Sequence, residues 1–101
     1  MTAVALAPRE FDDRDLVQRH LGGDPRAFGA LVDRYQTPLL NFVHGTIANR
    51  ERAEDLVIDV FIRVYRHVHR FDRSLEFRTR IYAIASALAE AELRGRVHQR
   101  G

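Results

Sequence analysis

The alternation of hydrophobic and polar positions is most regular between Arg52 and Arg70. Apolar residues recur there at helical spacing and form one continuous stripe: Ala53, Leu56, Val57, Val60, Phe61, Val64 and Val68. The opposite side carries Asp55, Asp59, Ile62 and Arg66, with Ile58 at its edge. A face that meets only solvent has no need of isoleucines. The pattern therefore predicts a helix with one core-facing side and one candidate contact side.

A shorter helix is predicted before this segment. Residues 1–11 have no periodicity, and we expect them to form a flexible lead-in. Asp12 or Asp13 can cap the first helix, because a carboxylate oxygen accepts hydrogen bonds from the free amides of a first turn. The pair Gly22-Gly23 is a typical helix stop.

The second helix is expected to begin at Asp24-Pro25, as N-cap and first helical residue, and to run to about Ala48. Pro38 falls inside it. Because proline cannot donate a backbone hydrogen bond and clashes with the preceding turn, we expect a bend or break near Gln36-Thr37.

The strongly periodic third helix is expected to begin at Asn49 or Arg50. Residues 71–76 break the pattern and predict a loop, in which Ser74 is a candidate cap for the final helix. That helix places Phe77, Ile81, Ile84 and Leu88 on one face and is expected to end near Arg94.

These elements predict an all-α fold, a compact bundle of about four helices, because no strand pattern occurs and the connections are short. We expect the helical domain to span residues 12–96, with a frayed tail at 97–101 and no second domain, so the chain is either a single small domain or a fragment of a larger protein.

Composition narrows the location and the chemistry. The chain has no cysteine, which excludes disulfides, thiolate catalysis and cysteine-based zinc sites and fits a reducing compartment. No apolar run is long enough to span a membrane, and the N-terminus lacks the features of a secretory signal. We predict a cytoplasmic protein that uses no cofactor.

Charge is divided unevenly along the chain. Residues 1–62 carry seven Arg against ten acids, a net −3, whereas residues 63–101 carry nine Arg against four acids, a net +5. Six arginines lie close together among Tyr65, Phe71 and Tyr82: Arg63, Arg66, Arg70, Arg73, Arg78 and Arg80. Arginine neutralises phosphates while aromatic rings stack on bases, so this segment is suited to single-stranded nucleic acid, and an ordinary charged exterior stays open as the alternative.

The sequence favours neither a metal site nor a catalytic site. His67 and His69 project from nearly opposite sides of a helix, and the other three histidines lie in separate elements, so no metal site is predicted. Asp55 and Asp59 are two acids on one face, as general acid–base catalysis needs. Because they stand among isoleucines and arginines on a helix exterior, a solvated charged face or a protein-docking face is favoured over an enzyme.

Four motifs occur in a characteristic order: a Gly-Asp followed by Ala-Phe, an Ala-Glu-Asp-Leu-Val helix, an Arg-Phe-Asp exit and a Phe-Arg-Thr opening. With these motifs, residues from about Asp15 to Arg96 resemble region 2 of the extracytoplasmic-function (ECF) sigma factors of bacterial RNA polymerase.

The resemblance implies two functional surfaces. One docks on the coiled coil of the polymerase β′ clamp and would use Asp55, Ile58, Asp59, Ile62 and Arg66. The other opens the promoter minus-ten element and holds its non-template strand, with a base flipped into a loop pocket. It would use Arg70, Phe71, Asp72, Arg73, Ser74, Phe77, Arg78, Thr79, Arg80, Tyr82, Ala83 and Ala87.

The chain also departs from the family. Ile58 stands where Gln is usual, which implies one polar clamp contact fewer. The final helix has Arg-Ile-Tyr-Ala-Ile-Ala-Ser-Ala at residues 80–87, where the family favours Trp-Leu-Tyr-Arg-Ile-Ala-Arg-Asn, and Ala91 replaces a usual Asp. An alternative therefore stays open: a degenerate sigma-like domain that serves as a protein-interaction or regulatory module, with an anti-sigma factor among its candidate partners.

Overall fold

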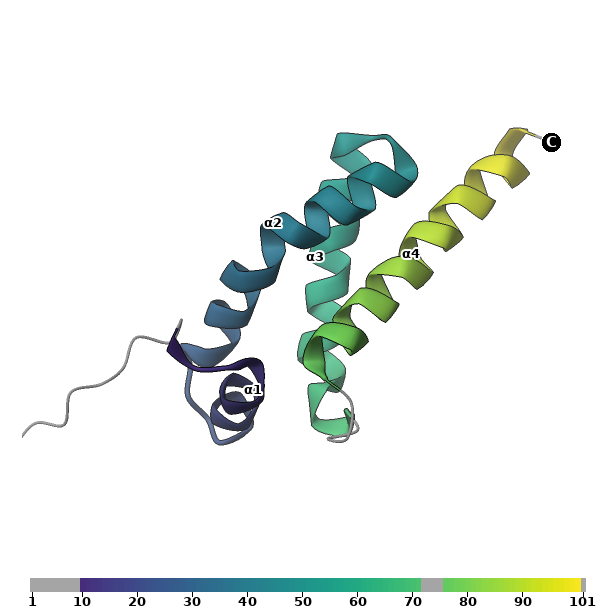
Figure 1. The fold of residues 1–101 in the computed structure, drawn as a ribbon. Coiled ribbons are helices and arrows are strands. Elements are labelled where there is room, and N and C mark those ends of the chain that lie inside the picture. The colour runs from purple at the N-terminus through teal and green to yellow at the C-terminus, as the bar shows by residue number, and fades with distance from the viewer. Residues whose placement is uncertain (1–9, 72–75, 101) are drawn as a thin grey trace, which may run out of the picture.

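The computed structural model describes residues 10–71 and 76–100, with side chains as far as residue 95. Within these residues the helices are α1 (Asp13–Leu21), α2 (Ala27–Ile47), α3 (Arg50–His67), the short 3-10 helix η2 (Val68–Arg70) and α4 (Phe77–Arg100). Figure 1 shows α2 and α3 joined by a tight turn, with α4 alongside them and α1 near the start of α2. The predicted all-α fold of about four helices is confirmed.

The predicted core stripe of α3 is confirmed in full. Its members are all buried, with Ala53, Val60 and Val64 completely inaccessible to solvent. The helix begins after Asn49, whose side-chain oxygen accepts a hydrogen bond of 3.1 Å from the amide of Arg52. Because this stripe faces inward, the opposite side of α3 is left on the surface.

The start of α1 also follows the prediction. Asp12 is the N-cap, and its carboxylate accepts a 2.8 Å hydrogen bond from the amide of Asp15. The helix ends at Leu21 with Gly22 as its C-cap, and Gly23 then adopts a positive φ of 98°, a conformation that glycine enters without steric cost.

The predicted start of α2 at Pro25 is two residues too early. The helix begins at Ala27, because the carboxylate of Asp24 accepts a 3.0 Å hydrogen bond from the amide of Arg26 and holds residues 24–26 outside the helix. Of the bend or break expected at Pro38, the break does not occur, since α2 is continuous. Leu39 and Val43 are completely buried just after the proline, and this packing outweighs the loss of one backbone hydrogen bond.

Helix α4 packs through small residues. It buries Phe77, Ile81, Ala85 and Ala89, while the predicted core residues Ile84 and Leu88 are half-buried at the edge of this face. The predicted end near Arg94 is wrong, because α4 continues to Arg100 through Gly95. An interior glycine costs only about 1 kcal/mol relative to alanine, which a long helix tolerates. The candidate cap Ser74 lies outside the described residues.

The prediction of a flexible lead-in over residues 1–11 is wrong for Phe11. Phe11 is half-buried against the core, and the guanidinium carbon of Arg19 lies 3.8 Å from the centre of its ring. Its carbonyl oxygen also accepts a 2.6 Å hydrogen bond from Arg34. None of the described helices is both long enough and apolar enough to cross a membrane.

Two candidate functional surfaces

The residues predicted to dock on the polymerase share the exposed side of α3. We call this set the α3 outer surface: Asp55, Ile58, Asp59, Ile62 and Arg66. Spacings of three and four residues bring them to one side of a helix. Ile58 is 59% exposed and Ile62 is 42% exposed, although both are large apolar side chains. The structure therefore assembles this predicted set as one continuous surface.

One arginine links the start of this surface to α4. The Nη1 atom of Arg52 lies 3.3 Å from Oδ2 of Asp55, and its Nη2 atom lies 2.6 Å from Oε1 of Glu92, which is in α4. The hydrogen bond to Glu92 and the negative charge of that residue raise the pKa of the Arg52 guanidinium. Asp59 has no ion pair among the described residues, so its carboxylate is available to a partner.

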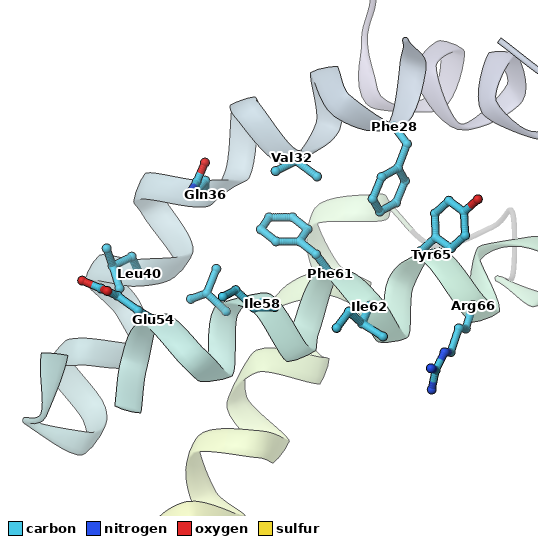
Figure 2. A pocket seen from close by; sticks show the side chains of 11 residues that line it. Phe28, Val32, Gln36, Leu40, Glu54, Ile58, Phe61, Ile62, Tyr65 and Arg66 are labelled. Atoms are coloured by element: carbon cyan, nitrogen blue, oxygen red, sulfur yellow. The ribbon is translucent and has the colours of Figure 1, made fainter. Parts of the chain in front are cut away.

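A groove runs between α2 and α3 beside the α3 outer surface, with a volume of about 800 Å³. Figure 2 shows Leu40 and Glu54 at one end and Phe28 and Tyr65 at the other. Its walls combine residues of the α3 outer surface with side chains of α2: Phe28, Val32, Gln36 and Leu40. The sequence reading missed the α2 wall. The residues that could have indicated it are Phe28 and Val32, which belong to the apolar stripe of α2.

The second predicted set, apart from residues 72–74, lies at the start of α4 and just before it. Arg70 is exposed and Phe71 is half-buried. We call the α4 members with accessible side chains the α4 surface: Arg78, Thr79, Arg80, Tyr82, Ala83 and Ala87. Phe77 does not belong to it, because its ring is only 7% exposed and packs in the core. Asp72, Arg73 and Ser74 lie outside the described residues.

The larger side chains of the α4 surface rest on aromatic rings. The guanidinium carbon of Arg78 lies 5.6 Å from the ring centre of Tyr35, and that of Arg80 lies 5.4 Å from the ring centre of Phe71. The Nε atom of Arg80 is buried and has no hydrogen-bond partner in the described structure. Cation–π contacts hold these arginines in place while their charges stay available for an anion.

Tyr82 is held differently. Its ring meets Phe42 edge to face at 5.3 Å, so it is half-buried against α2. Ala83 and Ala87 are exposed but carry no hydrogen-bonding group. The polar groups available on the α4 surface are therefore concentrated in its first turn.

A hydrogen-bonded network fixes the aromatic ring against which Arg78 packs. The Tyr35 hydroxyl donates to Asp13, and Arg34 lies 2.7 Å from the same carboxylate. The pKa of the Tyr35 hydroxyl is raised, mainly because the group is buried and to a smaller extent because it is hydrogen-bonded to Asp13. This network joins α1 to α2, and it fixes the ring over which Arg78 lies.

The described part of the chain contains no cluster of three or more His, Cys, Asp or Glu residues that could hold a metal ion. The two surfaces are instead suited to macromolecular contact. The sequence model of the family described as Sigma-70 region 2 matches residues 31–98. This chain belongs to the sigma-70 region 2 family.

Similar region 2 sequences occur in ECF sigma factors. The chain is 36% identical over 86 residues to the RNA polymerase sigma-H factor of Pseudomonas aeruginosa, covering 83% of this chain and 45% of that protein. It is 33% identical over 72 residues to the ECF RNA polymerase sigma factor SigW of Bacillus subtilis, covering 71% and 38%. The chain thus spans less than half the length of these relatives. It is a region 2 domain of the ECF type.

A solved region 2 structure has the same fold. It is the NMR structure of an engineered region 2 of sigmaE in complex with GTAAAA, with a TM-score of 0.78 and 32% sequence identity. The match covers 89% of this chain and 94% of the solved one. The sigma-70 region 2 family is non-enzymatic, so Asp55 and Asp59 are not catalytic acids.

Proposed function

We propose that this region 2 domain acts in transcription initiation, in the cytoplasm, by docking on RNA polymerase and engaging the promoter minus-ten element. The α3 outer surface contacts the β′ clamp coiled coil. The α4 surface, with Arg70 and Phe71, binds the non-template single strand after the duplex opens. The two contacts are made by different helices, so one domain can hold both partners at the same time.

The observation that carries this proposal is the similarity to the engineered sigmaE region 2, which was solved with the oligonucleotide GTAAAA. Charge supports the same assignment. The net charge is −3 over residues 1–62 and +5 over residues 63–101. Because nucleic acid is a polyanion, it is attracted to the second segment, while the acidic segment is left for a protein partner.

The first turn of α4 is suited to bind a DNA strand. The guanidinium groups of Arg78 and Arg80 are anchored on rings, so they lose little rotational freedom when they bind a phosphate. Thr79 is exposed between them and can donate or accept a hydrogen bond. The half-buried ring of Phe71 lies beside Arg80 and is the candidate stacking surface for a base.

A titration with fluorescent single-stranded DNA tests the DNA half of the proposal. The probe carries GTAAAA, and a scrambled oligonucleotide of the same composition is the control. We expect binding that is tighter for GTAAAA and that weakens as salt is raised, because phosphate contacts release counterions. Absence of binding at low salt would exclude promoter engagement by this domain.

A second candidate function is a regulatory or protein-interaction module that has lost promoter reading. The observation that favours it is the composition of the α4 surface, where Ala83 and Ala87 offer no hydrogen-bonding group and Tyr82 is packed on Phe42. Its partners would be polymerase, an anti-sigma factor or another sigma-like subunit. Polymerase binding without binding to either oligonucleotide would support this alternative.

A further inference from the structure

A carboxylate at the start of α1 holds the ring against which Arg78 of α4 packs. Asp13 is the first residue of α1, and each of its carboxylate oxygens has a partner on α2. Oδ1 accepts a 2.7 Å hydrogen bond from Nη1 of Arg34, and Oδ2 accepts one from the Tyr35 hydroxyl. The Nη2 atom of Arg34 also donates a 2.6 Å hydrogen bond to the carbonyl oxygen of Phe11. The start of α1 is therefore fixed to α2.

The ring of Tyr35 lies between this carboxylate and the first turn of α4. It is only 2% exposed, and the ring centre of Phe77 lies 5.6 Å from its own. The guanidinium carbon of Arg78 also lies 5.6 Å from the centre of the Tyr35 ring. Arg78 forms no ion pair with any residue that the structure describes. The position of its guanidinium group therefore depends on the position of this ring.

Packing does not fill the space around Arg78. Asp13, Arg34, Tyr35 and Arg78 all line a pocket of about 580 Å³ between α1 and the start of α4. An arginine beside an open space can adopt several rotamers, and a ligand that needs one of them must restrict the others at a cost in affinity. A ring held in one place reduces this cost, because it favours one position of the guanidinium group before the ligand arrives.

The hydroxyl of Tyr35 is not explained by core packing. Phenylalanine would fill almost the same space without a polar group, and a buried hydroxyl is costly unless it is hydrogen-bonded. Its acceptor belongs to a partly buried ion pair, in which the side chains of Asp13 and Arg34 are 23% and 27% exposed. Hydrogen bonds to charged groups in such surroundings are strong and restrict the groups that they join. The hydroxyl therefore fixes the ring.

Arg34 also determines how Asp13 affects Arg78. Because Asp13 and Arg78 line the same pocket, an unpaired carboxylate there would attract the Arg78 guanidinium and compete with a phosphate. The contact between Asp13 and Arg34 satisfies this carboxylate. The charge of Arg78 is thus left for an anion.

We infer that Asp13 is a positioning residue for DNA binding, which acts through Tyr35 to hold Arg78 where the strand meets α4. The inference rests on the proposed function, because its ligand is the single-stranded DNA that the α4 surface is proposed to bind. Asp13 does not touch the strand. The family model matches residues 31–98 and so leaves out α1, whose role is inferred here from its contacts.

The test is a titration of the fluorescent GTAAAA oligonucleotide with the full chain and with Asp13→Ala, at several salt concentrations and at a temperature at which both are folded. The substitution removes a negative charge, so net charge alone would tighten binding to DNA. We expect it to weaken binding about three- to tenfold instead, because Arg78 is no longer held. The slope of log affinity against log salt should fall by up to about 0.7, which corresponds to one phosphate contact.

Asp15→Ala is the matched control. Asp15 is an exposed acid in the same first turn of α1, and its replacement changes the net charge by the same amount. We expect this variant to bind GTAAAA at least as tightly as the wild-type chain.

Arg78→Gln separates positioning from a general loss of stability. In a chain that carries Arg78→Gln, Asp13→Ala should not weaken binding further, because the side chain that it positions is absent. Tyr35→Phe provides a second variant if Asp13→Ala does not fold, since it keeps the ring and removes only the hydroxyl. It should weaken binding about two- to threefold, and this effect should also disappear in the Arg78→Gln chain.

The outcomes distinguish this inference from the proposed function. If the wild-type chain does not bind GTAAAA at low salt, both fail. If it binds, but Asp13→Ala behaves like Asp15→Ala, the inference is wrong and promoter engagement stands. The same conclusion follows if Asp13→Ala or Tyr35→Phe weakens binding by an equal factor with and without Arg78, because the effect would then be structural.

Discussion

The outer sides of α3 and α4 are both left on the surface by the same core, but they carry different kinds of side chain. The α3 outer surface exposes isoleucines and unburied acids above a fully buried valine stripe. The α4 surface exposes alanines, and its larger residues Arg80 and Tyr82 turn back onto Phe71 and Phe42.

This difference indicates which surface has large side chains available for close contact with a binding partner. Large side chains held in the open are costly unless a partner covers them, whereas alanine is the neutral choice for a helix exterior. The α3 outer surface is therefore suited to a protein partner, and the proposed DNA contact depends on the few arginines at the start of α4.

Replacing one buried and one exposed isoleucine separates the shared core from the α3 outer surface and has the largest expected effect. Ile81 is completely buried, so Ile81→Ala should lower the free energy of unfolding by about 2–5 kcal/mol. Ile58→Ala should change it by less than about 0.5 kcal/mol, because this side chain is exposed. Urea denaturation measures both. A comparable loss for Ile58→Ala would show that the α3 outer surface is structural.

Neutralising the acids of α3 tests its role as a docking surface. Asp55→Asn combined with Asp59→Asn should weaken binding to core polymerase about tenfold at low salt and less at high salt, because screened charges contribute less. DNA binding should not change. Glu90→Gln on α4 is the control, and an equal effect of this variant would mean that only net charge matters.

Restoring polar groups to α4 tests the other half of the comparison. Ala83→Arg and Ala87→Asn place family-like residues at exposed positions and should tighten DNA binding several-fold. The added arginine should steepen the dependence of log affinity on log salt by about 0.7. Ala91→Arg adds the same charge further along α4. If it acts equally well, the gain is nonspecific attraction and not a defined DNA surface.

The smallest expected effect concerns the support shared by α1, α2 and Arg78. Tyr35→Phe removes one hydrogen bond and should cost about 1 kcal/mol of stability at neutral pH. Because burial raises the pKa of Tyr35 in the folded state, the wild-type chain should lose stability as pH rises above the unfolded value of about 10.

Tyr35→Phe should lack this part of the alkaline loss. The chain contains neither Lys nor Cys, so few other groups titrate in this range. Melting temperatures at pH 8 to 11 measure the difference. An identical pH profile in the variant would contradict the role of Tyr35.

Local features of the fold were predictable from the sequence. The valine stripe of α3 and the caps Asp12 and Asn49 depend on residues within a turn or two of one another. The start of α2 and the end of α4 were missed because side-chain hydrogen bonding at Asp24 competed with the helix, and because a single glycine at residue 95 was tolerated.

The missed features of the surfaces depend on contacts between distant residues. The sequence placed Asp55, Ile58 and Ile62 on one side of α3, but only packing shows that α2 supplies the second wall of the groove. The ion pair between Arg52 and Glu92 joins residues that no helical pattern connects. The burial of Phe77 follows the apolar face that the sequence predicted for the last helix, and not the DNA contact that the resemblance implied.

The turn between α2 and α3 fixes one end of the groove. Ala48 ends α2 in a left-handed conformation, with φ of 56°, and Asn49 already caps α3, so the two walls are joined almost directly at the end marked by Leu40 and Glu54. The other end is closed by a different contact, where Phe28 meets Tyr65 edge to face at 5.1 Å. That ring pair is the natural reporter of groove occupancy, because ring-current shifts would register a group that enters beside the two rings.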